Sequence, residues 1–206
     1  MFRILLTALV VFIAFVAFES YSSYRNYEHF QAGSRSLIKV QDQLSIADLT
    51  SSEQNVIGLR TELLAAGKHF RSARDGLERD PALKLASEVP EVDRQAIAMI
   101  ALAAAADELV QGGLEASEVF LAFVRYQESA PPTLRRGQEF VASQQTQIAR
   151  VQDRIAEAKL QRAKVHGLLL PPIVVARDEL DRAIARIDAL MAEYEVAATS
   201  GLTPRS

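Results

Sequence analysis

The three histidines of the chain, His29, His69 and His166, are the side chains best suited to metal binding or acid–base chemistry. None has a glutamate three residues before it, so the Glu-x-x-His pattern of di-iron helical bundles is missing. No His-x-x-x-His pair occurs either. His29 follows Glu28 in a tyrosine-rich zone and fits an interfacial residue, with pH sensing as the alternative that imidazole permits. We expect His69 and His166 at the surface or at the ends of a helical bundle, and we predict no metal or cofactor site.

Other catalytic patterns do not occur in the sequence. The chain has no cysteine, which excludes disulfides, thiolate metal sites and cysteine nucleophiles. It contains neither a glycine-rich phosphate loop nor a nucleophile elbow. The net charge of -3 and the pI of about 5.7 give no electrostatic reason to expect nucleic-acid binding. We therefore expect that the chain is not an enzyme and binds no nucleic acid.

Seven aromatic residues recur at every third position near the start of the chain: Phe12, Phe15, Phe18, Tyr21, Tyr24, Tyr27 and Phe30. Phenylalanine gives way to tyrosine at Glu19, the first charged residue after Arg3. Fully apolar rings suit lipid tails, whereas tyrosine suits the headgroup layer. A spacing of three falls about 60° short of a helical turn at each step, so the rings spiral around the helix. The pattern predicts a lone membrane anchor in residues 1–32, surrounded by lipid.

The run from Ile4 to Phe18 contains no charged residue. With the first two residues it makes an apolar rod of roughly 25 Å, slightly short of a hydrocarbon core of about 30 Å. Snorkelling of Arg3 and the interfacial tyrosines compensate for the difference. A cleaved signal peptide is the alternative interpretation, but no Ala-x-Ala cleavage site follows the run. We favour the anchor.

The orientation in the membrane is not decided by basic residues, because Arg3 precedes the run while Arg25 and Arg35 follow it. A basic start before an apolar run is what export machinery recognises. We therefore expect a cytoplasmic N-terminus and an exported body, periplasmic if the cell is bacterial. We expect that no apolar run after Phe18 is long enough to form a second membrane helix.

The body, residues 33–198, is predicted to be all-α: an antiparallel bundle of about four long helices, followed by a flexible tail at 199–206. We expect residues 36–49 to form a first helical segment, which continues the membrane helix if Gly33 and Ser34 do not break it. An N-cap is expected within Thr50 to Ser52, with Thr50-x-x-Glu53 and Ser51-x-x-Gln54 as capping-box candidates. Asp80-Pro81 ends the helix that follows and begins a short one, and Pro90 begins the next unit.

Four predicted helices carry apolar stripes. The first steps by three and four, as a and d positions do, at Val56, Leu59, Leu63, Ala66, Phe70, Ala73 and Leu77. The second, about 91–128, contains the wholly apolar run from Ala96 to Ala106, which is too short to span a bilayer and suits a central helix. The third, about 133–165, aligns Val141, Ile148, Val151, Ile155 and Ala158. The fourth, about 172–198, aligns Ile173, Leu180, Ile184, Ile187, Met191 and Tyr194.

Glycines interrupt these stripes. Gly58, Gly67 and Gly76 each cost the first helix about 1 kcal/mol relative to alanine, so we expect either close approach by a neighbour or local softness there. Gly112 and Gly113 mark a candidate bend in the second helix.

Basic residues gather towards the end of the third helix, where Asp153 and Glu157 interrupt them. We interpret them as a solvated face favoured by the helix dipole. We expect Asp178 and Arg182 to pair as i, i+4 neighbours.

Leu168, Leu169 and Leu170, followed by Pro171 and Pro172, form the most unusual loop. One interpretation is an apolar knuckle that docks on a partner or touches the membrane. The other, which we favour, is a bundle corner whose leucines cap the core while the prolines begin the next helix.

The sequence as a whole predicts a single-pass membrane protein whose bundle acts through protein–protein contacts as a scaffold or assembly subunit. Its expected partners are membrane lipid and a protein partner or a second copy of the chain. The alternative is an extracytoplasmic small-ligand sensing four-helix bundle that signals through a partner. Its layout is similar to that of chemoreceptor input domains, although no motif carries the similarity.

Overall fold

The computed structural model describes residues 28–29, 31–36, 51–86, 88–129 and 134–200. These residues are helical almost throughout, and no strand occurs among them, which confirms the all-α class. Five helices follow Ser51: α3 (Glu53–Arg79), α4 (Pro81–Ala86), α5 (Pro90–Ser129), α6 (Leu134–Ala163) and α7 (Pro171–Ser200). The seven aromatic residues of the predicted anchor lie outside the described residues.

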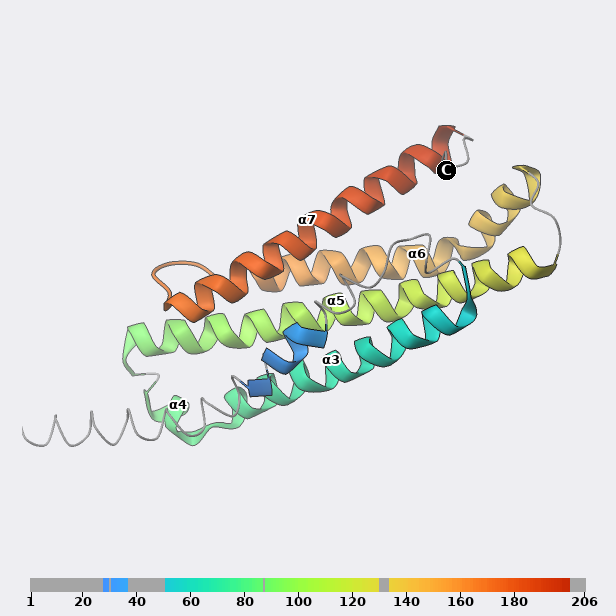
Figure 1. The fold of residues 1–206 in the computed structure, drawn as a ribbon. Helices are drawn as coiled ribbons and strands as arrows, with labels where there is room; N and C mark the ends of the chain where they lie inside the picture. The colour runs from blue at the N-terminus through green and yellow to red at the C-terminus, as the bar shows by residue number, and fades with distance from the viewer. Residues whose placement is uncertain (1–27, 30, 37–50, 87, 130–133, 201–206) are drawn as a thin grey trace, which may run out of the picture.

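The long helices α3, α5, α6 and α7 form an up-and-down bundle with α5 at its centre (Figure 1). Helices α3 and α6 run antiparallel to α5 on either side of it and pack along it. Helix α7 folds back antiparallel to α6 and then diverges from it towards its C-terminal end (Figure 1). Of the α7 side chains that the structure describes, the buried ones, Ile173, Leu180 and Ile184, lie in the first half of the helix.

Ser52 is the N-cap of helix α3. Its hydroxyl oxygen accepts a hydrogen bond of 3.2 Å from the backbone N–H of Asn55. Both predicted capping boxes are therefore wrong, because they place the cap one or two residues too early. With Ser52 as the cap, Glu53 becomes the first helical residue instead of the third. Its carboxylate forms an ion pair with Arg125 of α5, which ties the start of α3 to the end of its neighbour.

The packing of α5 against both neighbours depends on adjacent glycines. A Cβ on Gly113 would lie 3.0 Å from Leu63 Cδ1 of α3, and one on Gly112 would lie 3.3 Å from Arg154 Cβ of α6. Helix α5 continues through both residues without a break, and the absence of side chains there permits close approach on two sides. Gly67 of α3 meets Val110 of α5 in the same way, with a distance of 3.0 Å from the added Cβ to Val110 Cγ1.

Among the described residues one helix, α5, is long and apolar enough to cross a membrane by length and composition. The expectation that no such helix follows Phe18 is therefore wrong, because the apolar run continues beyond Ala106 with few charged residues. By itself this is weak evidence of membrane association, since core helices of soluble proteins meet the same criterion. Half of the apolar 18-residue stretch of α5 that meets it is buried inside the molecule. Both flanks of α5 are covered by α3 and α6.

Candidate contact surface at the α6–α7 turn

At its midpoint, the turn between α6 and α7 has a backbone conformation that glycine adopts more readily than any other residue. Gly167 has a φ of +86°, in the left-handed region that side chains rarely adopt. A Cβ at this position would also lie 3.1 Å from Cδ of Arg94 on α5. The chain is thus turned sharply before the three leucines, and α7 begins directly after them at Pro171.

Gln95 of α5 holds the next part of the turn with both ends of its side-chain amide. Its Nε2 donates to the carbonyl oxygen of Leu168 at 3.0 Å, and its Oε1 accepts from the N–H of Leu170 at 3.0 Å. One side chain therefore satisfies a backbone acceptor and a backbone donor two residues apart. Such a clamp fixes the conformation of the intervening leucine without using any bond inside the turn.

The three leucines have different environments. Leu169 is buried in the core with Val165 and Ile173, as expected for a bundle corner. Leu168 is 83% exposed and Leu170 is 57% exposed, so the expectation that all three cap the core is wrong for these two. Gln95 holds the backbone on both sides of Leu169, whose side chain is buried, while the side chains of its two neighbours are exposed. Val175, one turn into α7, is also largely exposed. We call Leu168, Leu170 and Val175 the turn surface.

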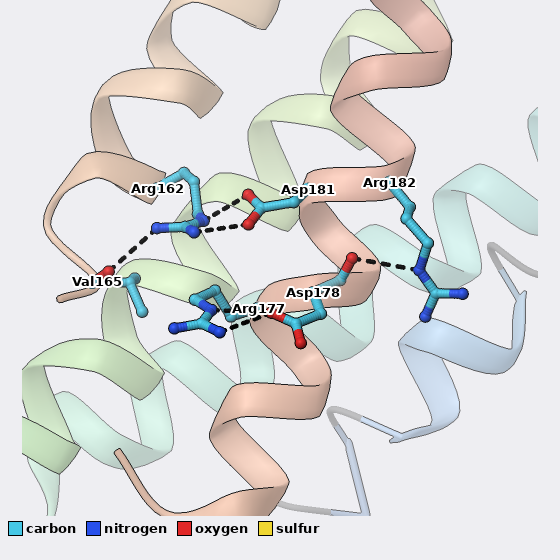
Figure 2. A network of polar contacts seen from close by, with 6 residues as sticks. All are labelled: Arg162, Val165, Arg177, Asp178, Asp181 and Arg182. Carbon is cyan, nitrogen blue, oxygen red and sulfur yellow. Dashed lines mark hydrogen bonds and ion pairs between the residues drawn. The ribbon is translucent and has the colours of Figure 1, made fainter. Parts of the chain in front are cut away.

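Arg162, at the end of α6, joins the turn to α7 (Figure 2). Its Nε and Nη2 atoms each donate to a carboxylate oxygen of Asp181 at 2.6 Å, and its Nη1 donates to the carbonyl oxygen of Val165 at 3.0 Å. The bidentate geometry fixes both the distance and the relative orientation of the two helices. Lys159, about one turn earlier, pairs with Asp188 across the same helix contact at 2.7 Å.

The basic residues of α6 are mostly exposed to solvent, as the sequence predicted. Four of them also pair with acids of neighbouring helices, in the pairs Arg150–Glu115, Arg154–Glu108, Lys159–Asp188 and Arg162–Asp181. The predicted pairing of Asp178 with Arg182 is wrong in its detail. Arg182 donates to the backbone carbonyl of Asp178, whose carboxylate binds the adjacent Arg177 (Figure 2). Sequence separation alone does not reveal these partners.

The residues predicted to pack helices together lie in the two halves of the core. Those on α3 and the first two of those on α7 are buried: Val56, Leu59, Leu63, Phe70, Leu77, Leu180 and Ile184. The remaining two, Ile187 and Met191, are half-buried, and Ile187 packs against the core cluster that contains Leu180 and Ile184.

Two of the three histidines meet, which the sequence did not predict. The Nδ1 atoms of His29 and His69 are 3.2 Å apart although 40 positions separate the residues. His166 lies exposed in the α6–α7 turn. No group of three or more histidine, aspartate or glutamate side chains that could hold a metal ion occurs in the part of the chain that the structure describes.

Comparison of the chain with family models, with curated proteins and with solved structures finds no match.

Proposed function

We propose that this chain is a single-pass membrane-anchored helical bundle that acts through protein–protein contacts as a scaffold or assembly subunit. We further propose that the turn surface is a point of contact with a partner protein. The observation that carries the proposal is the exposure of Leu168 and Leu170 on a backbone that Gln95 clamps from both sides.

A fixed apolar projection favours binding because little conformational freedom remains to be lost on association. Ordering flexible side chains and loops opposes binding, and preorganisation reduces that cost. Gly167, Gln95 and Arg162 together fix the backbone of the turn before any partner arrives. Contacts that dominate interface energies are typically a few anchored apolar side chains surrounded by weaker contacts.

The surroundings of the turn surface fit a protein better than a lipid bilayer. Exposed Glu179 and Arg182 follow Val175 at helical spacing on α7, and exposed Lys164 and His166 precede the leucines. Protein interfaces typically have an apolar centre and a polar rim that contains both charge signs. A surface for anionic headgroups would instead show a cluster of about four to eight lysines and arginines.

The size of the full chain in mild detergent tests this contact. We expect the wild type to be larger than a monomer by light scattering, and we expect the double variant Leu168→Ser, Leu170→Ser to shift towards the monomer. Leu64→Ser is the matched control, because Leu64 of α3 is 52% exposed, close to the 57% of Leu170, and lies outside the turn. A wild type that is extracted from its membrane as a monomer, bound neither to a second copy nor to another protein, contradicts the proposal, as does equal dissociation by the control variant.

We propose that the body lies outside the cytoplasm, because the basic residue Arg3 directly precedes the uncharged run from Ile4 to Phe18, a pattern that export machinery recognises. The absence of cysteine from the sequence makes a direct test available. A single cysteine at Ser200 should react with an impermeant thiol reagent in intact cells, and the wild type is the blank. Labelling that appears only after lysis contradicts an exported body.

A further inference from the structure

Arg94 of α5 is half-buried and has no acidic partner among the residues that the structure describes. The other half-buried arginines of those residues each pair with an acid: Arg60, Arg71, Arg74, Arg154, Arg162 and Arg177. The acids nearest to Arg94 in the sequence, Glu91 and Asp93, form no ion pair with it. Arginine is the cation best suited to a partly buried ion pair, because its planar guanidinium binds a carboxylate through two hydrogen bonds.

The side chain of Arg94 lies at one end of the turn surface. A Cβ on Gly167 would be 3.1 Å from Cδ and 3.5 Å from Nε of Arg94, so the arginine passes the turn directly before Leu168. Exposed Lys164 precedes the leucines as well and adds positive charge at this end. Its ammonium group donates to the neutral side chain of Gln161. The cations at this end of the turn surface are therefore not neutralised within the described part of the chain.

An exposed acid lies at the opposite end of the turn surface. Glu179 follows Val175 by four residues on α7, and both side chains are exposed on the same face of the helix. Glu179 forms neither an ion pair nor a hydrogen bond with any described residue. Arg182, about one turn later, donates to the backbone carbonyl of Asp178 instead. The carboxylate of Glu179 is thus available to a partner.

The turn surface therefore has a cation at one end, apolar side chains in the middle and an acid at the other end. Such a surface is complementary to itself when a second copy is rotated by 180°, because each cation then faces the acid of the other copy. Two-fold contacts of this kind, in which residue i meets j and j meets i, are the commonest in homo-oligomers. We propose that the partner at the turn surface is a second copy of this chain, with Arg94 of each copy bound to Glu179 of the other.

This inference rests on the proposed contact at the turn surface and names the partner in it. Leu168, Leu170 and Val175 supply the apolar centre, and the two ion pairs lie at its rim. Charges at the rim of an interface determine register and choice of partner more than affinity. Because the ion pair occurs twice in a two-fold contact, the reversal of one charge acts at two places.

Exchange of the two charges tests the contact in the full chain, with light scattering in mild detergent over a dilution series as the measurement. Arg94→Glu and Glu179→Arg should each raise the dissociation constant of the dimer about tenfold, because like charges then face each other twice. The double variant Arg94→Glu, Glu179→Arg should return to within about threefold of the wild type, since the attraction is restored in the opposite sense. Glu128→Arg, which reverses an exposed acid at the far end of α5, is the matched control and should dimerise like the wild type.

The possible results separate this inference from the contact on which it rests. Glu179 is exposed, so Glu179→Arg leaves the fold intact, and undiminished dimerisation of that variant overturns the proposal. A folded double variant that stays monomeric also overturns it. A wild type that carries a different protein and no second copy overturns the inference but leaves the contact at the turn surface standing. A monomeric wild type without any bound protein contradicts both.

Discussion

The side-chain oxygen Oε1 of Gln95 accepts a hydrogen bond of 3.0 Å from the backbone N–H of Leu170. The same amide donates from Nε2 to the carbonyl oxygen of Leu168. Through these two bonds the central helix sets which leucines of the α6–α7 turn are buried and which are exposed. The proposed contact surface thus depends on a residue of α5 that need not touch the partner.

Replacement of Gln95 by alanine should loosen the turn. The loss of two hydrogen bonds is expected to lower the free energy of unfolding by about 1–3 kcal/mol, at roughly 0.5–1.5 kcal/mol for each bond. Amide hydrogen exchange at Leu170 should become faster than in the wild type. Gln152→Ala, at an exposed position on α6, is the control and should leave that exchange rate unchanged.

The glycines of α3 should respond in opposite directions to the same substitution. No atom lies within 4 Å of a Cβ added to Gly58, so Gly58→Ala should stabilise the helix by about 1 kcal/mol. A Cβ on Gly67 would lie 3.0 Å from Val110 Cγ1, so Gly67→Ala should destabilise the bundle by about 1–3 kcal/mol through overpacking. Chemical denaturation of both variants measures the difference, and a gain in stability for Gly67→Ala would contradict the close α3–α5 contact.

Arg162 should contribute more to stability than Arg177, although each pairs with an aspartate of α7. Arg162 connects two helices and is 22% exposed, whereas Arg177 binds the next residue in its own helix. We expect Arg162→Ala to cost about 1–2 kcal/mol, and Arg177→Ala less than about 0.5 kcal/mol. Urea unfolding at low and high salt provides the measurement. Equal costs for both variants would show that the bidentate pair does not hold α7 in place.

Phe70 should be the most sensitive apolar position of α3, because its ring packs against α5 and also supports Gly33. Its side chain is 1% exposed, and Phe70→Ala should lower the free energy of unfolding by about 3–5 kcal/mol. Leu64→Ala is the control at an exposed position of the same helix, with an expected change within about 0.5 kcal/mol. Denaturant midpoints compare the two variants. A small effect of Phe70→Ala on the free energy of unfolding would mean that residues 31–36 do not shield the ring from solvent.

The helices could be predicted from local sequence because their signals are local. The three-and-four spacing from Val56 to Leu77 indicates one face of one helix, and those residues are buried in α3. Prolines at positions 81, 90 and 171 begin α4, α5 and α7, since proline fits the first helical turn without loss of a hydrogen bond. The exact cap at Ser52 could not be predicted, because several adjacent polar residues satisfy the same rule.

Contacts between helices could not be predicted, because they depend on the register in which two helices pack. Arg162 reaches Asp181 and Arg154 reaches Glu108 only after the lengths of the turns have set that register. The contact between His29 and His69 depends in addition on the close packing of Gly33 against the ring of Phe70. Likewise, three consecutive leucines give no sign of which one faces the core; the amide of Gln95 determines that from another helix.

Photo-crosslinking from position 168 in native membranes tests the proposed function most directly. A photoreactive residue in place of Leu168 should give one protein adduct of defined mass, in near-stoichiometric yield, and an adduct of twice the chain mass would identify a second copy as the partner. The same residue at Leu64, exposed on α3, should give no such adduct. Crosslinks only to lipid, or the same adducts from both positions, would contradict a protein contact at the α6–α7 turn.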